Sequence, residues 1–182
     1  KTQFARFILR ITGWKLVREV PAEPKFVGLV APHTSNWDFV WGKLAIMGLG
    51  IKGYVLTKKE LFFFPLGIIL RAFGAKAIDR SKSSSLIRQV IGYFHEADSF
   101  ILFITPEGTR SKTSRWKPGF HFIARNAQVP VYLTFIDYRT KRLGLHQGIE
   151  LTEDVRADIN RIKEAYSQFT PKFPENFSTE PQ

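Results

Sequence analysis

The sequence predicts a single α/β domain in which a largely parallel central sheet is flanked by helices. Short apolar runs typical of strands alternate along the chain with segments of helical periodicity. One run, residues 100–104, is apolar throughout, as expected for a central strand that is covered on both faces. The 182 residues, 44% of them hydrophobic, are enough for one domain with its own core.

The first predicted element is a basic amphipathic helix over about residues 2–17. Phe4, Phe7 and Ile11 recur at helical spacing, and the charged residues between them are cationic. The pattern fits a helix that packs on the domain, and it fits a helix on a membrane surface equally well. No uninterrupted apolar run in the sequence approaches the ~20 residues that a spanning helix needs.

A predicted strand over residues 26–31 ends at Pro32. Ser35 or Asn36 can then accept hydrogen bonds from the first amides of a helix, which the apolar spacing extends to about Leu49.

The apolar segment 61–73 contains Pro65 and is too short to span a bilayer. We interpret it as a buried core helix, with a hairpin that contacts lipid as the alternative. The other predicted strands are 54–57, 77–79, 129–136 and, as an edge strand or hairpin, 141–151. The other predicted helices are 86–97, 119–126 and 152–169, with coil from Pro171.

The formal net charge of +11 favours anionic partners, namely phospholipid surfaces, nucleic acid or phosphorylated substrates. Aromatic residues interleaved with Lys and Arg suit a membrane interface and also a single-stranded nucleic acid. The sequence has no cysteine, which excludes disulfides and thiolate metal sites.

A histidine and an aspartate, His33 and Asp38, stand five positions apart just after the predicted strand 26–31. A carboxylate that accepts a bond from one imidazole nitrogen raises the basicity of the other, which can then take a proton from an alcohol. The alternative is a helix-capping aspartate beside a loop histidine. His95, His121 and His146 are isolated in the sequence, and we interpret them as structural or surface residues. No histidine spacing indicates a metal site.

The stretch 105–111 directly follows the apolar strand 100–104. Gly108 permits a tight turn, Arg110 can hold a phosphate with two hydrogen bonds, and Thr109 can add another. Glu107 can anchor Arg110 or bond substrate hydroxyls. A surface turn with a salt bridge is the alternative.

Two further cations are candidates for the same rim. Arg80 ends its own short predicted strand and would complete a phosphate clamp, and Lys117 precedes a predicted helix. The carboxyl ends of strands are where open α/β sheets bind ligands.

These stretches resemble the two signature blocks of the glycerolipid acyltransferases, the lysophosphatidic acid and glycerol-3-phosphate acyltransferase group. His33 to Asp38 resembles the first block, and residues 106–111 resemble the second. Two minor blocks are also similar, at 74–80 and 129–131. The resemblance covers residues 33–131 and implies a fold like that of glycerol-3-phosphate acyltransferase.

The resemblance further implies that His33 is the general base and that Asp38 orients it. Arg80, Glu107, Gly108 and Arg110 would bind the phosphate and glycerol part of the acceptor, with Thr109 and Lys117 as additional candidates. The donor would be an acyl thioester on coenzyme A or acyl carrier protein, with no cofactor besides. The acceptor would be a lysophospholipid, most simply 1-acylglycerol-3-phosphate, and apolar surfaces near 61–73 would hold the acyl chain.

The resulting hypothesis is a peripheral O-acyltransferase on the cytoplasmic face of an anionic membrane, without nucleic acid as a partner. Its acyltransferase domain would cover 19–170, between a basic amphipathic helix in 1–18 and a coil in 171–182. One alternative changes the acceptor to another lysolipid or an amino-acid lipid. Another is a non-catalytic basic module that binds membrane or nucleic acid, which explains the charge but neither the His–Asp spacing nor Glu107.

Overall fold

A central sheet organises the computed structural model, which describes residues 1–17, 19–79 and 83–182. Within these ranges seven strands pair in the order β1-β7-β6-β2-β5-β3-β4. Strands β6, β2, β5, β3 and β4 are parallel, and β7 is antiparallel to β6. The strands are β1 (Lys15–Leu16), β2 (Lys25–Val30), β3 (Gly53–Lys58), β4 (Ala75–Ile78), β5 (Phe100–Ile104), β6 (Val131–Asp137) and β7 (Arg142–Ile149). The predicted α/β domain with a mostly parallel sheet is confirmed.

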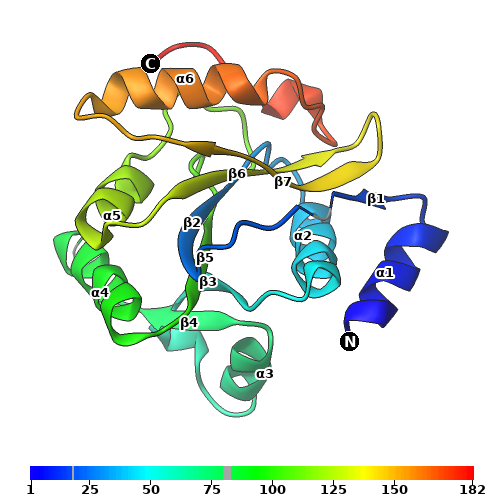
Figure 1. The fold of residues 1–182 in the computed structure, drawn as a ribbon, viewed down its shortest axis with the longest axis horizontal. Helices are drawn as coiled ribbons and strands as arrows, with labels where there is room; N and C mark the ends of the chain where they lie inside the picture. The colour runs from blue at the N-terminus through cyan, green and yellow to red at the C-terminus, as the bar shows by residue number, and fades with distance from the viewer. Residues whose placement is uncertain (18, 80–82) are drawn as a thin grey trace.

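Helices cover both faces of this sheet (Figure 1). Helices α4, α5 and α6 lie on one face and α1 and α2 on the other, while α3 packs beside the edge strand β4. The helices are α1 (Thr2–Ile11), α2 (Asn36–Leu49), α3 (Leu66–Ala72), α4 (Ser83–Glu96), α5 (Gly119–Ala127) and α6 (Val155–Tyr166), with short 3₁₀ turns η1 (Lys59–Leu61) and η2 (Pro174–Asn176). None of the helices in the described ranges has the length and apolar character needed to cross a bilayer.

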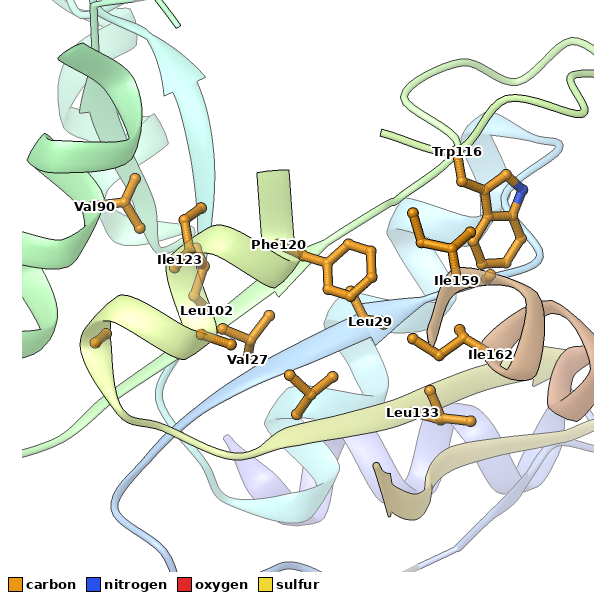
Figure 2. Close-up of a cluster of buried hydrophobic side chains, with 14 of the residues drawn as sticks. Val27, Leu29, Val90, Leu102, Trp116, Phe120, Ile123, Leu133, Ile159 and Ile162 are labelled. Carbon is orange, nitrogen blue, oxygen red and sulfur yellow. The ribbon is translucent and has the colours of Figure 1, made fainter. Parts of the chain in front are cut away.

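The larger core lies between the sheet and helices α4, α5 and α6. Alternate residues of each strand face it, because side chains point to opposite faces of a sheet in turn. Val27 and Leu29 of β2 meet Phe120 of α5 there (Figure 2). Other buried side chains that Figure 2 labels in this core are Val90, Leu102, Trp116, Ile123, Leu133, Ile159 and Ile162.

Glycines on both neighbours of β5 make room for one aromatic ring on the opposite face. A Cβ atom at Gly28 would lie 2.6 Å from the Phe103 ring, and one at Gly53 would lie 2.4 Å from it. Both distances are shorter than carbon atoms tolerate. The ring of Phe103 therefore spreads over the adjacent strands and faces α2, where Ile46 packs against its cluster.

The N-terminal helix is shorter than predicted and ends at Ile11 instead of near residue 17. The Thr12 hydroxyl bonds back to the Ile8 carbonyl, and Gly13 turns the chain with φ of +81°. Lys15–Leu16 then pairs with β7 as an edge strand. Helical periodicity in the sequence does not reveal this earlier end of the helix. Trp14 fits the apolar spacing of a continued helix, although it is in fact buried in the turn that follows α1.

The interpretation of residues 61–73 as a buried core helix is wrong. Helix α3 covers only Leu66–Ala72, and Gly67 is the one residue of this helix that is buried. The segment lies beyond the edge strand β4, and one strand is too narrow to cover its apolar side chains. The large apolar side chains of this region that are exposed are Leu61, Phe63, Phe64, Ile68, Ile69 and Phe73.

The C-terminal region from Pro171, predicted as coil, contains η2 and is tied to the domain. The Phe173 amide donates to the Thr34 hydroxyl, and the Trp116 amide donates to Oε1 of Gln182. Strand β7, predicted as an edge strand or hairpin, forms a hairpin with β6 and lies inside the sheet because β1 adds to its outer side.

Candidate active site

Three loops meet at the carboxyl ends of the adjacent strands β6, β2 and β5. His33 follows β2, Glu107 follows β5, and Tyr138 follows β6. Since parallel strands end at the same edge of a sheet, residues distant in sequence come together there. The structure thus places the His33 and Glu107 stretches side by side.

The start of α2 fixes the position of Asp38. Ser35 is the N-cap of the helix, and its hydroxyl accepts a hydrogen bond from the Trp37 amide. Oδ2 of Asp38 accepts from the amides of Thr34 and Ser35, each at 2.8 Å. These bonds form a capping box, which gives partners to amides just before the helix and in its first turn.

His33 lies against this carboxylate. Its Nδ1 is 3.4 Å from Oδ2 of Asp38, a close contact longer than a well-formed hydrogen bond. The side chain of Asp38 is 2% exposed and that of His33 is 20% exposed, so the imidazole is the partner that reaches solvent. Asp38 is therefore both a capping residue and the neighbour of the histidine, two roles that the sequence presented as alternatives.

Asp38 stays ionised despite its burial. Burial by itself raises the pKa of this carboxyl, but the contacts with His33, Tyr138 and the Ser35 amide outweigh it and lower the pKa below its ordinary value. A carboxylate held in this state can stabilise a neighbouring imidazolium.

Tyr138 is a site residue that the sequence did not reveal. Its hydroxyl donates a 2.6 Å hydrogen bond to Oδ1 of Asp38. Burial, followed by the bond to Asp38 and its charge, raises the pKa of Tyr138, so the phenol remains a donor. The sequence feature that could have indicated it is its position directly after β6, a third strand that ends at the same edge of the sheet.

Glu107 points inward instead of toward the rim. The residue is 3% exposed, and its Oε1 accepts a 2.9 Å hydrogen bond from the His33 amide. Burial raises the pKa of Glu107 to about 8; the His33 amide opposes this rise and the negative charge of Asp38 adds to it. The carboxyl thus supports the His33 loop, a contact that sequence reasoning did not anticipate.

The turn after Glu107 exposes the remaining candidates. Gly108 has φ of +65°, and a Cβ atom there would lie 2.7 Å from the Lys117 side chain. The end of the Lys117 side chain could move aside for such an atom, so the positive φ is the feature that favours glycine at this position. Thr109 and Arg110 are exposed, and the Thr109 hydroxyl accepts from the Ser111 amide at 3.2 Å. Arg80 lies outside the described residues.

A cavity of about 1110 Å³ opens beside these loops. Its polar lining includes His33, Asp38, Arg110 and Lys117, and its apolar lining includes Ile46, Leu49, Val55 and Phe103. Phe73 also lines it, and the Phe73 carbonyl accepts from Nζ of Lys43 at 2.8 Å. The arrangement joins a basic group, two cations and a long apolar wall in one space.

The described residues contain no group of three His, Asp or Glu side chains that would hold a metal ion. His121, isolated in the sequence, is buried and lies 2.9 Å from Oδ2 of Asp158, which joins α5 to α6 on the far face. The contact agrees with a structural role for His121.

Comparison with known proteins identifies the family to which this chain belongs. The family model described as Acyltransferase matches residues 17–136, well over half of the chain. A curated relative, "1-acyl-sn-glycerol-3-phosphate acyltransferase" of Cocos nucifera, is 38% identical over 130 residues, which are 67% of this chain. The chain spans 42% of the length of that relative.

A solved structure shares the fold. It is the 1-acyl-sn-glycerophosphate (LPA) acyltransferase PlsC from Thermotoga maritima, with a TM-score of 0.57 at 19% sequence identity, over 93% of this chain and 80% of that one. The predicted resemblance to the glycerolipid acyltransferases is confirmed, and the chain belongs to the acyltransferase family.

Proposed function

We propose that this chain transfers a fatty acyl group from a thioester to a hydroxyl of a lysophospholipid, most simply 1-acylglycerol-3-phosphate. The observation that carries the proposal is the contact between His33 and Asp38 at the polar end of the apolar cavity. Membership in the acyltransferase family and the likeness to the coconut protein support the same chemistry.

The proposed reaction needs no covalent acyl-enzyme. Nδ1 of His33 faces Asp38, which leaves Nε2 to take the proton of the acceptor hydroxyl as that oxygen attacks the thioester carbonyl carbon. When the tetrahedral intermediate collapses, the carbon–sulfur bond breaks and the imidazolium returns the proton to the leaving thiolate. The products are an ester and a free thiol.

The rim of the cavity suits an acceptor with a phosphate. Arg110 and Lys117 both line it within the turn that follows β5. Arg110 can form two parallel bonds to phosphate oxygens, and Lys117 adds a point charge. We assign Arg80, Thr109 and Gly108 to the same acceptor site by their match to the family blocks, and Glu107 to its support.

The donor would be acyl-CoA or acyl carrier protein, with its acyl chain along the apolar wall at Ile46, Leu49 and Phe103. We further propose that the chain works on an anionic membrane at its cytoplasmic face. Exposed Phe4, Phe7 and Ile11 on α1, beside cations of the same helix, support this placement.

A thiol-release assay tests the proposed function. The wild type should release thiol from acyl-CoA or acyl carrier protein only when a lysolipid is present, and a panel of lysolipids identifies the acceptor. His33→Ala should abolish release, because the base is lost while the backbone bond to Glu107 remains. His95→Ala, at an exposed position of α4, is the matched control.

Near-full activity of His33→Ala would overturn the mechanism. No thiol release from any donor, together with salt-dependent binding to DNA, would favour the non-catalytic basic module instead.

A further inference from the structure

The carboxylate of Asp38 has its two oxygens engaged differently. Oδ2 is shared by the amides of Thr34 and Ser35 and lies against His33. Oδ1 accepts from the hydroxyl of Tyr138, the shortest of the contacts to this side chain. Because rotation about the bond between Cβ and the carboxyl carbon is soft, the partners of both oxygens decide how the carboxylate plane is set.

We propose that Tyr138 is a positioning residue for acyl transfer: by bonding Oδ1, it holds the Asp38 carboxylate so that Oδ2 faces Nδ1 of His33. The inference rests on the proposed role of His33 as the base. It adds a third loop, the one after β6, to a site that the sequence motifs place on two.

The ring of Tyr138 is itself held in place. The ring of Trp14, which is buried after α1, meets it edge-on with centroids 5.1 Å apart, and Trp14 also lies 5.1 Å from Trp41 of α2. The Tyr138 amide donates to the carbonyl of Thr170 at 2.8 Å. Aromatic pairs in such tilted and edge-on arrangements are favourable, so these contacts fix the position of the Tyr138 ring and hence of its hydroxyl beside Asp38.

The direction of the bond is also fixed. Burial and the neighbouring carboxylate raise the pKa of Tyr138, so the phenol keeps its proton and donates. Asp38, whose pKa is lowered, accepts. A charged acceptor strengthens such a bond, which makes its loss consequential for the orientation of the carboxylate.

Tyr138→Phe tests the inference, because it removes the hydroxyl and keeps the ring against Trp14. The matched control is Tyr132→Phe on β6, the strand that precedes Tyr138; its hydroxyl bonds a different carboxylate, that of Glu23, at 3.0 Å. We expect kcat for acyl transfer to fall about tenfold in Tyr138→Phe, with the KM of both substrates unchanged, and no fall in Tyr132→Phe.

A second readout is independent of turnover. The nitrogen chemical shifts of ¹⁵N-histidine-labelled protein report which ring nitrogen of His33 carries the proton. Loss of the Asp38 orientation should increase the form protonated at Nε2, the form that cannot act as a base. Both kcat and the His33 tautomer are measured below the unfolding temperature of each variant. A loss of stability alone therefore does not produce the expected changes.

The outcomes separate the inference from the function on which it rests. A Tyr138→Phe variant with the kcat and the His33 tautomer of Tyr132→Phe overturns the positioning role, even if His33→Ala is inactive. An active His33→Ala overturns the proposed function, and the positioning role with it. A fall in kcat with a shifted tautomer supports both.

Discussion

The backbone amide of His33 donates a 2.9 Å hydrogen bond to Oε1 of Glu107, 74 positions further along the chain. The bond joins the loop after β2 to the loop after β5, two strands that pair along five residues. Its consequence is that the two sequence blocks form one structural unit, with the acidic residue of the second block supporting the histidine of the first.

Substitution of Glu107 should distinguish this support from direct binding of the acceptor. Glu107→Gln keeps an oxygen that can accept from the His33 amide, whereas Glu107→Ala leaves that part-buried amide without this partner, at a cost of at most ~1–3 kcal/mol. We expect Glu107→Ala to lower kcat ~10-fold or more and Glu107→Gln to lose much less. Steady-state kinetics with varied acceptor checks this: a rise in acceptor KM alone in Glu107→Gln would instead assign the carboxylate to the substrate.

The buried carboxyl of Glu107 should make stability depend on pH. Its pKa is raised from 4.5 to about 8, so the folded state binds the proton more tightly than the unfolded state. The resulting stability is fully present below pH 4.5 and is lost as pH rises through 8, with a slope of at most ~1.4 kcal/mol per pH unit. Urea unfolding at several pH values should show this decline in the wild type and a flatter profile in Glu107→Gln. Parallel profiles for the two proteins would contradict it.

Two substitutions of Asp38 should separate helix capping from catalysis. Asp38→Asn retains an oxygen for the Thr34 and Ser35 amides, so the start of α2 should survive, while the charge beside His33 is lost. Asp38→Ala also removes the acceptor of these two amides while the Ser35 cap remains, which costs ~1 kcal/mol more in unfolding free energy. We expect both variants to lose activity by ~100-fold or more. Only Asp38→Ala should show the additional loss of unfolding free energy. An active Asp38→Asn would limit the residue to capping.

Arg110 should affect the acceptor and not the chemical step. It lines the cavity and is exposed, so Arg110→Ala should leave the fold intact and raise the KM of a phosphate-bearing acceptor ~10-fold or more. Lys112→Ala, an exposed cation two positions away, is the control. If both variants raise KM equally, general electrostatic attraction explains the effect and Arg110 has no specific role.

Helix α1 should contribute to membrane binding. Phe4, Phe7 and Ile11 are 61%, 59% and 62% exposed, on the side of the helix opposite the buried Leu9. Phe4→Ser with Phe7→Ser should weaken binding to vesicles that contain phosphatidylglycerol, measured by co-sedimentation. Val20→Ser, at another exposed apolar position, should bind as the wild type does. Equal binding of all three proteins would remove α1 from the contact.

Elements whose pattern is strong in the sequence are the ones predicted well. The apolar run of β5 and the capped start of α2 were both expected within a residue or two. The end of α1 and the exposure of the segment around α3 were not, because periodicity reports which residues are apolar and not what covers them. Phe63 and Phe64 are as apolar as core residues and yet lie on the surface.

The sequence by itself determined the fold class and the two blocks that hold His33, Asp38, Glu107 and Arg110, because these depend on residue type and local spacing. Tertiary structure alone decided that Glu107 turns inward to the His33 amide and that Tyr138 bonds Asp38. Both contacts join loops 74 and 100 positions apart, and only the pairing of β6, β2 and β5 brings those loops to one edge of the sheet. No local pattern can encode such a contact, since its partners become neighbours only after the strands align.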